Sequence, residues 1–149
     1  MKTVYNRKAR FHYHLLENFE AGIVLSGAET KSVKNGRIDI SSAYISVSNH
    51  ELFLIGATIS RYAFSGTAED YDPVHPRRLL MKKKEIYSLE GKIEGERLTL
   101  VPIKVYTKRN RVKVGLALAR GKSRVDKRES ILKREALRHI GRMIRGKLG

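Results

Sequence analysis

Five short basic segments hold most of the side chains that could engage a partner. They are Arg7-Lys8-Ala9-Arg10, Arg77-Arg78, Lys82-Lys83-Lys84, Lys108-Arg109-Asn110-Arg111 and the stretch that follows Arg120. The whole chain has 31 Lys and Arg against 15 Asp and Glu, a formal net charge of +16. A charge of this size favours a polyanionic partner. The segments predict contact with nucleic-acid phosphates, and a merely solvated surface is the alternative.

Aromatic residues stand beside several of these basic segments. They are Tyr5, Phe11, Tyr13, Tyr87 and Tyr106. Aromatic rings next to cations can stack on unpaired bases, which is typical of proteins that bind structured RNA. The same rings can belong to the core, and for Phe11 and Tyr106 both interpretations stay open. Cations and rings together predict an RNA-binding protein.

Residues that could hold a metal or catalyse a reaction are sparse. His12 and His14 would share one face of a strand, but no further ligand is spaced nearby. The run Glu69-Asp70-Tyr71-Asp72 could bind Mg²⁺, although a solvated loop is the simpler interpretation. The chain has no Cys, no Gly-rich phosphate loop and no convincing Ser-His-acid set. We therefore expect no enzyme, no catalytic residue, no metal site and no cofactor.

The basic charge is spread unevenly along the chain. Residues 120–149 hold 11 basic and 3 acidic side chains, a net of +8, and residues 1–119 hold 20 and 12, also +8. This asymmetry predicts an RNA-binding body over 1–119 and a basic C-terminal tail over 120–149. Apolar residues at helical spacing from Lys127 to Leu148 predict a basic helix, which should stay largely disordered until RNA neutralises it.

The remaining pattern predicts a mainly β fold with short helices. Strands are expected over 11–19, 21–27, 43–48, 52–59, 98–106 and 112–119. Helices are expected over 28–35, ended by Gly36, and over 79–91, with Leu80, Ile86 and Leu89 as a buried stripe. Pro102 indicates an edge or a bulge. These elements predict an OB-like closed antiparallel β-barrel, with a mixed α+β sheet as the runner-up.

Motifs along nearly the whole chain resemble a known family. They are Asn6-Arg7-Lys8-Ala9-Arg10 with Tyr13, Phe19-Glu20-Ala21-Gly22-Ile23-Val24-Leu25, Gly27-Ala28-Glu29-Thr30-Lys31-Ser32, Asp72-Pro73, Arg77-Arg78-Leu79-Leu80-Met81, Leu100-Val101-Pro102, Lys113-Val114, Leu118-Ala119-Arg120-Gly121-Lys122 and Asp126-Lys127-Arg128. In this order and spacing the chain resembles the small protein B family, the SsrA-binding proteins that partner transfer-messenger RNA (tmRNA) in bacterial ribosome rescue.

The resemblance implies a protein that binds the tRNA-like domain of tmRNA and delivers it to stalled ribosomes. The family's RNA-contact positions map to Asn6, Glu20, Leu80, Lys82 and Lys113, and the basic Arg7, Lys8 and Arg10 join them. For Glu20 and Leu80 a role in supporting the fold is the alternative to RNA contact. The family's tail motif, which meets small-subunit RNA in the decoding centre and the empty mRNA path, maps to Gly121, Lys122, Asp126, Lys127 and Arg128.

Three positions depart from the family pattern. His75 stands where relatives usually have Arg, and Met81 where they usually have Leu. Val125 replaces a frequent His or Tyr, which puts a stacking role at that position in doubt.

The expected form is a monomer bound to RNA. A structural ribosomal-type protein and an RNA-processing enzyme are the alternative functions. The chain shows no signal peptide and no membrane-spanning run, so we expect a cytoplasmic protein that does not bind membranes.

Overall fold

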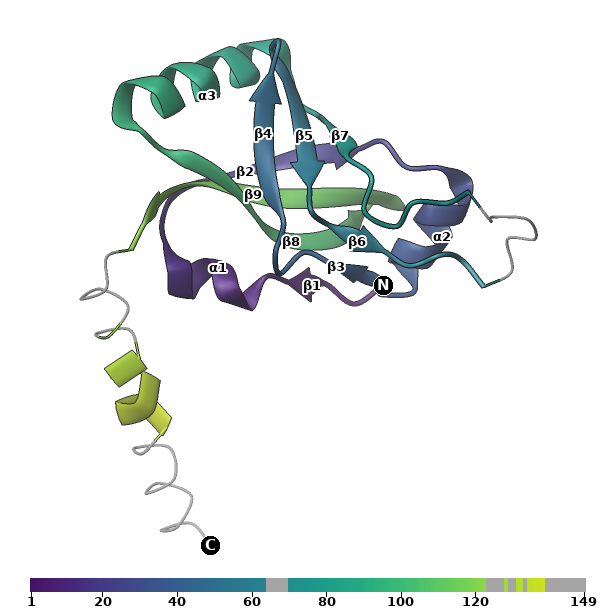
Figure 1. Ribbon diagram of the computed structural model, residues 1–149, viewed down its shortest axis with the longest axis horizontal. Helices are drawn as coiled ribbons and strands as arrows, with labels where there is room; N and C mark the ends of the chain where they lie inside the picture. The colour runs from purple at the N-terminus through teal and green to yellow at the C-terminus, as the bar shows by residue number, and fades with distance from the viewer. Residues whose placement is uncertain (64–69, 123–127, 129–130, 133, 139–149) are drawn as a thin grey trace, which may run out of the picture.

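The computed structural model describes residues 1–63, 70–122, 128, 131–132 and 134–138. Its elements are β1 (Val4–Tyr5), α1 (Arg7–His12), β2 (Tyr13–Ile23), α2 (Gly27–Lys34), β3 (Ile38–Asp39), β4 (Tyr44–Ser48), β5 (Glu51–Ile55), β6 (Thr58–Ile59), β7 (Arg77–Leu80), α3 (Lys83–Glu96), β8 (Thr99–Lys108) and β9 (Arg111–Gly121). The mainly β architecture with short helices is confirmed (Figure 1).

The larger sheet closes on itself. Its strands follow the order β1-β8-β4-β5-β7-β2-β9, and β9 also pairs with β8, so β8, β4, β5, β7, β2 and β9 form a ring of antiparallel strands. Closure satisfies the strand edges that would otherwise be exposed. The short strand β1 adds to β8 beyond the place where β4 pairs with it. The OB-like label for this ring stays a prediction.

The hydrophobic core lies inside the ring. Its fully buried members include Leu52, Leu54, Leu100, Leu116 and Leu118. Helix α3 lies across one end of the sheet, while α2 lies at the other end beside β3 and β6 (Figure 1). Both helices therefore cover the ends of the ring and leave part of its outer surface open.

Two bulges decide which residues face outward. In β2 the pairing with β9 shifts between Leu15 and Glu17, and in β8 it shifts between Pro102 and Lys104. Each bulge adds one residue and reverses the alternation of the strand. Pro102, predicted to mark an edge or a bulge, therefore lies at a bulge. Beyond the bulges, even-numbered residues of β2 and β8 share the outer face with odd-numbered residues of β9.

Helix α1 covers the outer face on one side of these bulges. Its buried Ala9 packs with Val101 of β8 and Ala119 of β9. The partly buried Tyr13 and Leu15 of β2 complete this small cluster. The remaining outer face, on the other side of the bulges, is open to solvent and polar.

A buried ion pair ties strand β7 to helix α2. The side chain of Arg77 is fully buried and donates to Glu29 Oε2 through Nη2 at 2.8 Å and Nε at 3.1 Å. Its Nη1 also donates to the carbonyl of Ala57 at 2.9 Å. Tyr71 and His75 reach the same Glu29 carboxylate. Arg77, which the sequence placed in a phosphate-binding segment, is therefore part of the core.

The strands predicted over 43–48, 98–106 and 112–119 are confirmed as β4, β8 and β9, whereas the strand predicted over 52–59 is divided into β5 and β6. The β4–β5 and β8–β9 hairpins and helix α2 are present. Helix α3 begins at Lys83 and continues through Gly91 to Glu96, whereas Leu79 and Leu80 belong to β7. Ile86 and Leu89 are buried as predicted, but Leu80 is half exposed.

The N-terminal segment and the two predicted N-terminal strands also differ from expectation. No element was predicted before residue 11, but the N-terminal segment forms β1 and α1, so His12 ends a helix and does not share a strand face with His14. The two strands predicted over 11–19 and 21–27 are one continuous strand, β2, which spans only Tyr13–Ile23, since α1 extends to His12 and α2 begins at Gly27.

Candidate nucleic-acid interface

Two rows of side chains cross the open outer face. Residues directly opposite each other in paired strands share a face, so the register defines the rows. The first row is Tyr5, Lys104, Gly115 and Glu20, taken from β1, β8, β9 and β2. The second row is Tyr106, Lys113, Gly22 and Leu80, taken from β8, β9, β2 and β7. Five strands, β1, β2, β7, β8 and β9, thus contribute to one surface.

Glu20 is the acidic centre of this surface. The Tyr106 hydroxyl donates a hydrogen bond to Glu20 Oε2, and Lys108 Nζ lies 3.5 Å from Oε1. The hydrogen bond from Tyr106 lowers the pKa of Glu20, and the charges of Lys108 and Lys113 lower it further. Glu20 is therefore ionised at neutral pH and presents acceptors that a base amino group or a 2′-hydroxyl can use.

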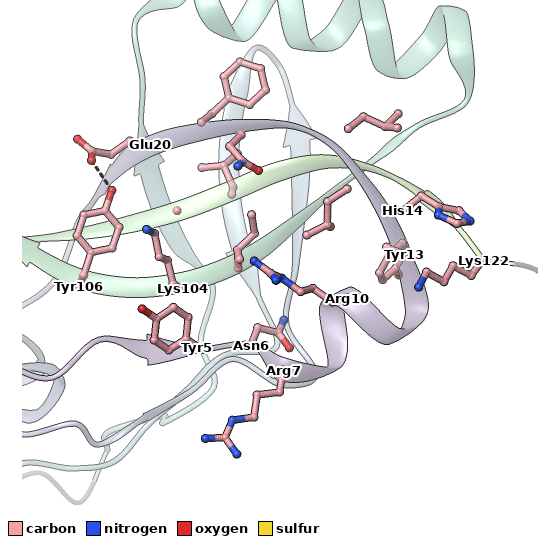
Figure 2. A pocket seen from close by; sticks show the side chains of 17 residues that line it. Tyr5, Asn6, Arg7, Arg10, Tyr13, His14, Glu20, Lys104, Tyr106 and Lys122 are labelled. Carbon is pink, nitrogen blue, oxygen red and sulfur yellow. Dashed lines mark hydrogen bonds between the residues drawn. The ribbon is translucent and has the colours of Figure 1, made fainter. Parts of the chain in front are cut away.

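The hydrogen bond between Tyr106 and Glu20 also changes the pKa of Tyr106. Burial raises the pKa of Tyr106 to about 12, and the hydrogen bond to Glu20 adds to the effect. Lys104 Nζ lies 5.0 Å from the centre of the Tyr106 ring, within the range of a cation–π contact. Lys104 lies between the rings of Tyr106 and Tyr5 (Figure 2). The phenol stays protonated and holds the carboxylate in one orientation.

Two glycines on this face leave space for neighbouring side chains to lie close to the sheet. A Cβ on Gly22 would lie 3.5 Å from Leu80 Cβ and 3.8 Å from Lys113 Nζ. A Cβ on Gly115 would lie only 2.9 Å from Lys104 Cγ, so the stem of that lysine crosses directly over the glycine. The glycines thus allow Leu80, Lys113 and Lys104 to lie close to the sheet.

A groove of about 1050 Å³ runs from this face toward α1. Its lining includes Tyr5, Arg10, Tyr13, Glu20, Lys104 and Lys122. In Figure 2 Arg10 extends over the groove, and Arg7, on the same short helix, also belongs to its lining. The groove is open to solvent and lined by cations and aromatic edges, which suits an extended polyanion better than a small enclosed ligand.

Asn6 lies beneath the edge of the groove. It is 6% exposed, its backbone N–H donates to the Ile103 carbonyl at 2.7 Å, and its Nδ2 donates to the Pro102 carbonyl at 2.9 Å. It therefore satisfies two carbonyls at the β8 bulge and holds the start of α1 there. Its Oδ1 is buried without a hydrogen-bond partner among the described residues.

The predicted site residues divide into those that share the open face and those that do not. Glu20, Leu80 and Lys113 lie on it, and Asn6 supports its edge. Arg7 and Lys8 are exposed on α1, and Lys82 is exposed at the start of α3.

The predicted tail residues lie at or beyond the end of the ring. Gly121 pairs with Tyr13 at the end of β9, and the Lys122 N–H donates to the His12 carbonyl at 2.9 Å. Arg128 is exposed, whereas Asp126 and Lys127 lie outside the described residues, as does Val125. Residues 131–132 and 134–138 are helical.

The sequence did not single out Lys104 as a site residue, and it left the role of Tyr106 open. Val101 faces outward and is buried beneath α1. Without the bulge, the alternation of β8 would continue from Val101 and place Lys104 and Tyr106 on the inner face. Pro102 is the one signal in the sequence that predicts the irregularity.

Two further features were sought in the described part of the chain. No group of three or more His, Asp or Glu side chains there is arranged to hold a metal ion. Among the same residues, no helix is long and apolar enough to cross a membrane.

The fold and the face together define a class: a small basic protein whose closed antiparallel sheet presents an open, cation-rich outer surface. A family model described as SmpB protein matches residues 3–146. The chain is 47% identical over 147 residues to the SsrA-binding protein of Desulforudis audaxviator, which covers 98% of this chain and 95% of that one. It is 44% identical over 140 residues to the SsrA-binding protein of Trichodesmium erythraeum, covering 94% and 90%.

A solved structure described as "tmRNA-SmpB: a journey to the center of the bacterial ribosome" contains a similar chain. The TM-score is 0.66 at 41% identity, with 87% of this chain and 94% of that chain covered. On this evidence the chain belongs to the SmpB family, the family of SsrA-binding proteins.

Proposed function

We propose that this protein is the adaptor that binds the tRNA-like domain of tmRNA and delivers it to stalled ribosomes for trans-translation. The observation that carries the proposal is the open face on which Glu20, Leu80 and Lys113 meet, each from a different strand. The names of the relatives, SsrA-binding protein, support the identity of the RNA. The protein acts in the cytoplasm, without cofactor or catalysis.

The face offers three kinds of contact to RNA. Lys113 and Lys104 supply positive charge for phosphates. Leu80, 50% exposed, supplies an apolar surface for a base or ribose. Glu20, held by Tyr106, supplies acceptors that can distinguish a base edge from a phosphate. A surface of phosphate contacts alone would bind any RNA, whereas this combination favours one shape and one set of unpaired bases.

Identifying the bound RNA tests the first half of the proposal. RNA that co-purifies with the protein should be enriched in one species with a tRNA-like end. A structural ribosomal-type protein would instead carry bulk ribosomal RNA and remain on active ribosomes. Bulk ribosomal RNA as the main species would therefore contradict the proposal.

Salt dependence tests the face itself. Lys113→Ala should weaken binding to the isolated tRNA-like domain and reduce the magnitude of the log K against log salt slope by about 1. Lys92→Ala is the matched control, because Lys92 lies on α3 and pairs with Glu17 at 2.8 Å. An equal slope for the two variants would mean that Lys113 is only solvated.

The second half of the proposal concerns residues 120–149. We propose that they form a basic tail, of which Arg120 and Gly121 still pair in β9, and that the part beyond the ring enters the decoding centre and the empty mRNA path after the body, residues 1–119, has bound tmRNA. The tail holds half of the net charge in a fifth of the chain. Cutting after Lys122, which keeps β9 intact, should reduce binding to free tmRNA only modestly and largely stop peptide tagging on stalled ribosomes. Normal tagging, or a proportional loss of binding and tagging, would refute this division of roles.

A further inference from the structure

The turn between β8 and β9 is unusual in its residues. Lys108 and Arg111 form the last pair of the hairpin, so the loop consists of Arg109 and Asn110 alone. Both have positive φ, 52° and 63°. Such two-residue turns favour Asn or Asp followed by Gly, because the left-handed conformation is unfavourable for side chains such as Arg. Arg109 therefore occupies a position where glycine would fit with less strain.

Helix α2 holds this turn in place. The ammonium of Lys34 donates to the backbone carbonyl of Asn110 at 3.1 Å and to its Oδ1 at 3.0 Å. Lys34 lies in the last turn of α2, which covers the end of the ring next to the hairpin (Figure 1). Two hydrogen bonds from a separate element restrict the backbone conformation of the turn, so the backbone of Arg109 is held in place.

The charges at the turn are not neutralised by protein. Within the described part of the chain, neither Arg109 nor Arg111 forms an ion pair, and both are exposed. The carboxylate of Glu20, on the same face, is already engaged by Tyr106 and Lys108. Two guanidinium groups are thus available for an external anion.

The turn continues the proposed RNA-binding face. In the register of β8 and β9, the pair Lys108 and Arg111 follows the pair Tyr106 and Lys113 by two residues and lies on the same outer surface. A strand rises about 3.3 Å per residue, so the two pairs lie roughly 7 Å apart, close to the spacing of successive phosphates in an RNA strand. An RNA strand in contact with Lys113 would therefore pass the turn.

We propose that the β8–β9 turn is a second phosphate-contacting element of this protein, with Arg109 as its principal contact and Arg111 beside it. The inference rests on the proposed function and extends the RNA footprint beyond Glu20, Leu80 and Lys113. A guanidinium matches a phosphate with two parallel hydrogen bonds, and a preorganised arginine loses less entropy on binding. We assign the RNA backbone as the partner, since Asn110 Oδ1 is already engaged by Lys34 and the exposed guanidinium groups match phosphate oxygens.

The test uses two arginines in the same backbone conformation. Arg97 ends α3 with φ 53° and stands just before β8, so it lies at the far end of that strand from the turn. Arg109→Gly and Arg97→Gly each remove one positive charge and one unfavourable φ. Both full-length variants should unfold at the same denaturant concentration as wild type or at a higher one.

Only the change at the turn should affect RNA. Arg109→Gly should reduce the magnitude of the salt slope by about 1 and weaken binding roughly fivefold at 0.15 M salt, as expected for one lost phosphate contact. Arg97→Gly should leave both unchanged. A variant that is more stable yet binds RNA less well separates a contact from a structural role, because a structural defect would lower both.

Equal salt slopes for Arg109→Gly and Arg97→Gly would overturn the inference. If Lys113→Ala still reduced the slope in that case, the proposed function would stand without the turn. A wild-type protein that did not prefer the tRNA-like domain to an unrelated RNA hairpin would instead refute the proposed function. The comparison of the two glycine variants on either RNA would even then decide whether the turn contacts phosphate.

Discussion

Replacing Glu29 by Gln should cause the largest loss of stability among single changes outside the apolar core. The Glu29 side chain is 6% exposed, and its Oε2 accepts from Nε and Nη2 of Arg77, from His75 Nε2 and, at 3.3 Å, from the Tyr71 hydroxyl. Removing one partner of a buried ion pair leaves the other charge uncompensated, which costs about 3–5 kcal/mol. A domain of this size is stable by only about 5–15 kcal/mol.

The lowered pKa of Glu29 gives a second value for the stabilisation that this ion pair provides. Burial raises the pKa of Glu29, but the hydrogen bonds from the Ser26 backbone and from Arg77, with the charge of Arg77, outweigh it and lower the pKa from 4.5 to about 2. This difference corresponds to about 3 kcal/mol. Because the folded-state pKa is the lower one, the stabilisation is complete above the unfolded-state value of 4.5. It is lost as the pH falls from there toward 2.

Urea denaturation followed by circular dichroism between pH 7 and pH 3 measures both effects. Glu29→Gln should unfold at much lower urea at pH 7, and the gap to wild type should narrow below pH 4.5, since other carboxylates contribute equally to both proteins. Glu17→Gln is the control, because Glu17 pairs with Lys92 at the surface and should cost less than about 1 kcal/mol. A Glu29→Gln variant within 1 kcal/mol of wild type, or with an unchanged pH profile, would refute this account.

Two further predictions concern the open face. Gly115→Ala should displace the Lys104 side chain, because Lys104 Cγ lies 2.9 Å from the position of the new Cβ. The RNA affinity should therefore fall, while the free energy of unfolding, measured by urea denaturation, should change by less than about 1 kcal/mol. An unchanged affinity would show that Lys104 contributes nothing to RNA binding. Glu20→Gln should lower the pKa of Tyr106 from about 12, since one of its causes is removed, whereas a spectrophotometric titration with no change would mean that burial alone raises it.

Much of the fold could be predicted where local pattern and tertiary packing agree. The alternation from Val112 to Leu118 predicted β9, and Gly36 marked the end of α2. Strand β7 could not be recognised because it turns an arginine inward: Arg77 and Leu79 are buried, while Leu80 is exposed. A buried charge is costly without a partner, and Glu29 lies 48 residues away in the chain.

Helix α1 was missed for a different reason. It spans only Arg7–His12 and buries one residue, Ala9, so it has no apolar periodicity to detect. A helix this short is unstable in isolation. It forms here because Ala9 packs on β8 and β9, and because Asn6 fixes its first turn to the β8 bulge.

The site itself depends on the two bulges more than on any single residue. Before its bulge, β2 turns Leu15 outward to pack under α1; without the extra residue, the same alternation would turn Glu20 into the core. The matching bulge in β8 lets Val101 pack beneath α1 while Lys104 faces solvent. The side-chain alternation of both strands reverses at nearly the same position along β9. The two strands that flank β9, β2 and β8, therefore carry an apolar cluster at one end and a charged surface at the other. The proposed RNA-binding face thus begins where the outer surface of the sheet is no longer covered by α1.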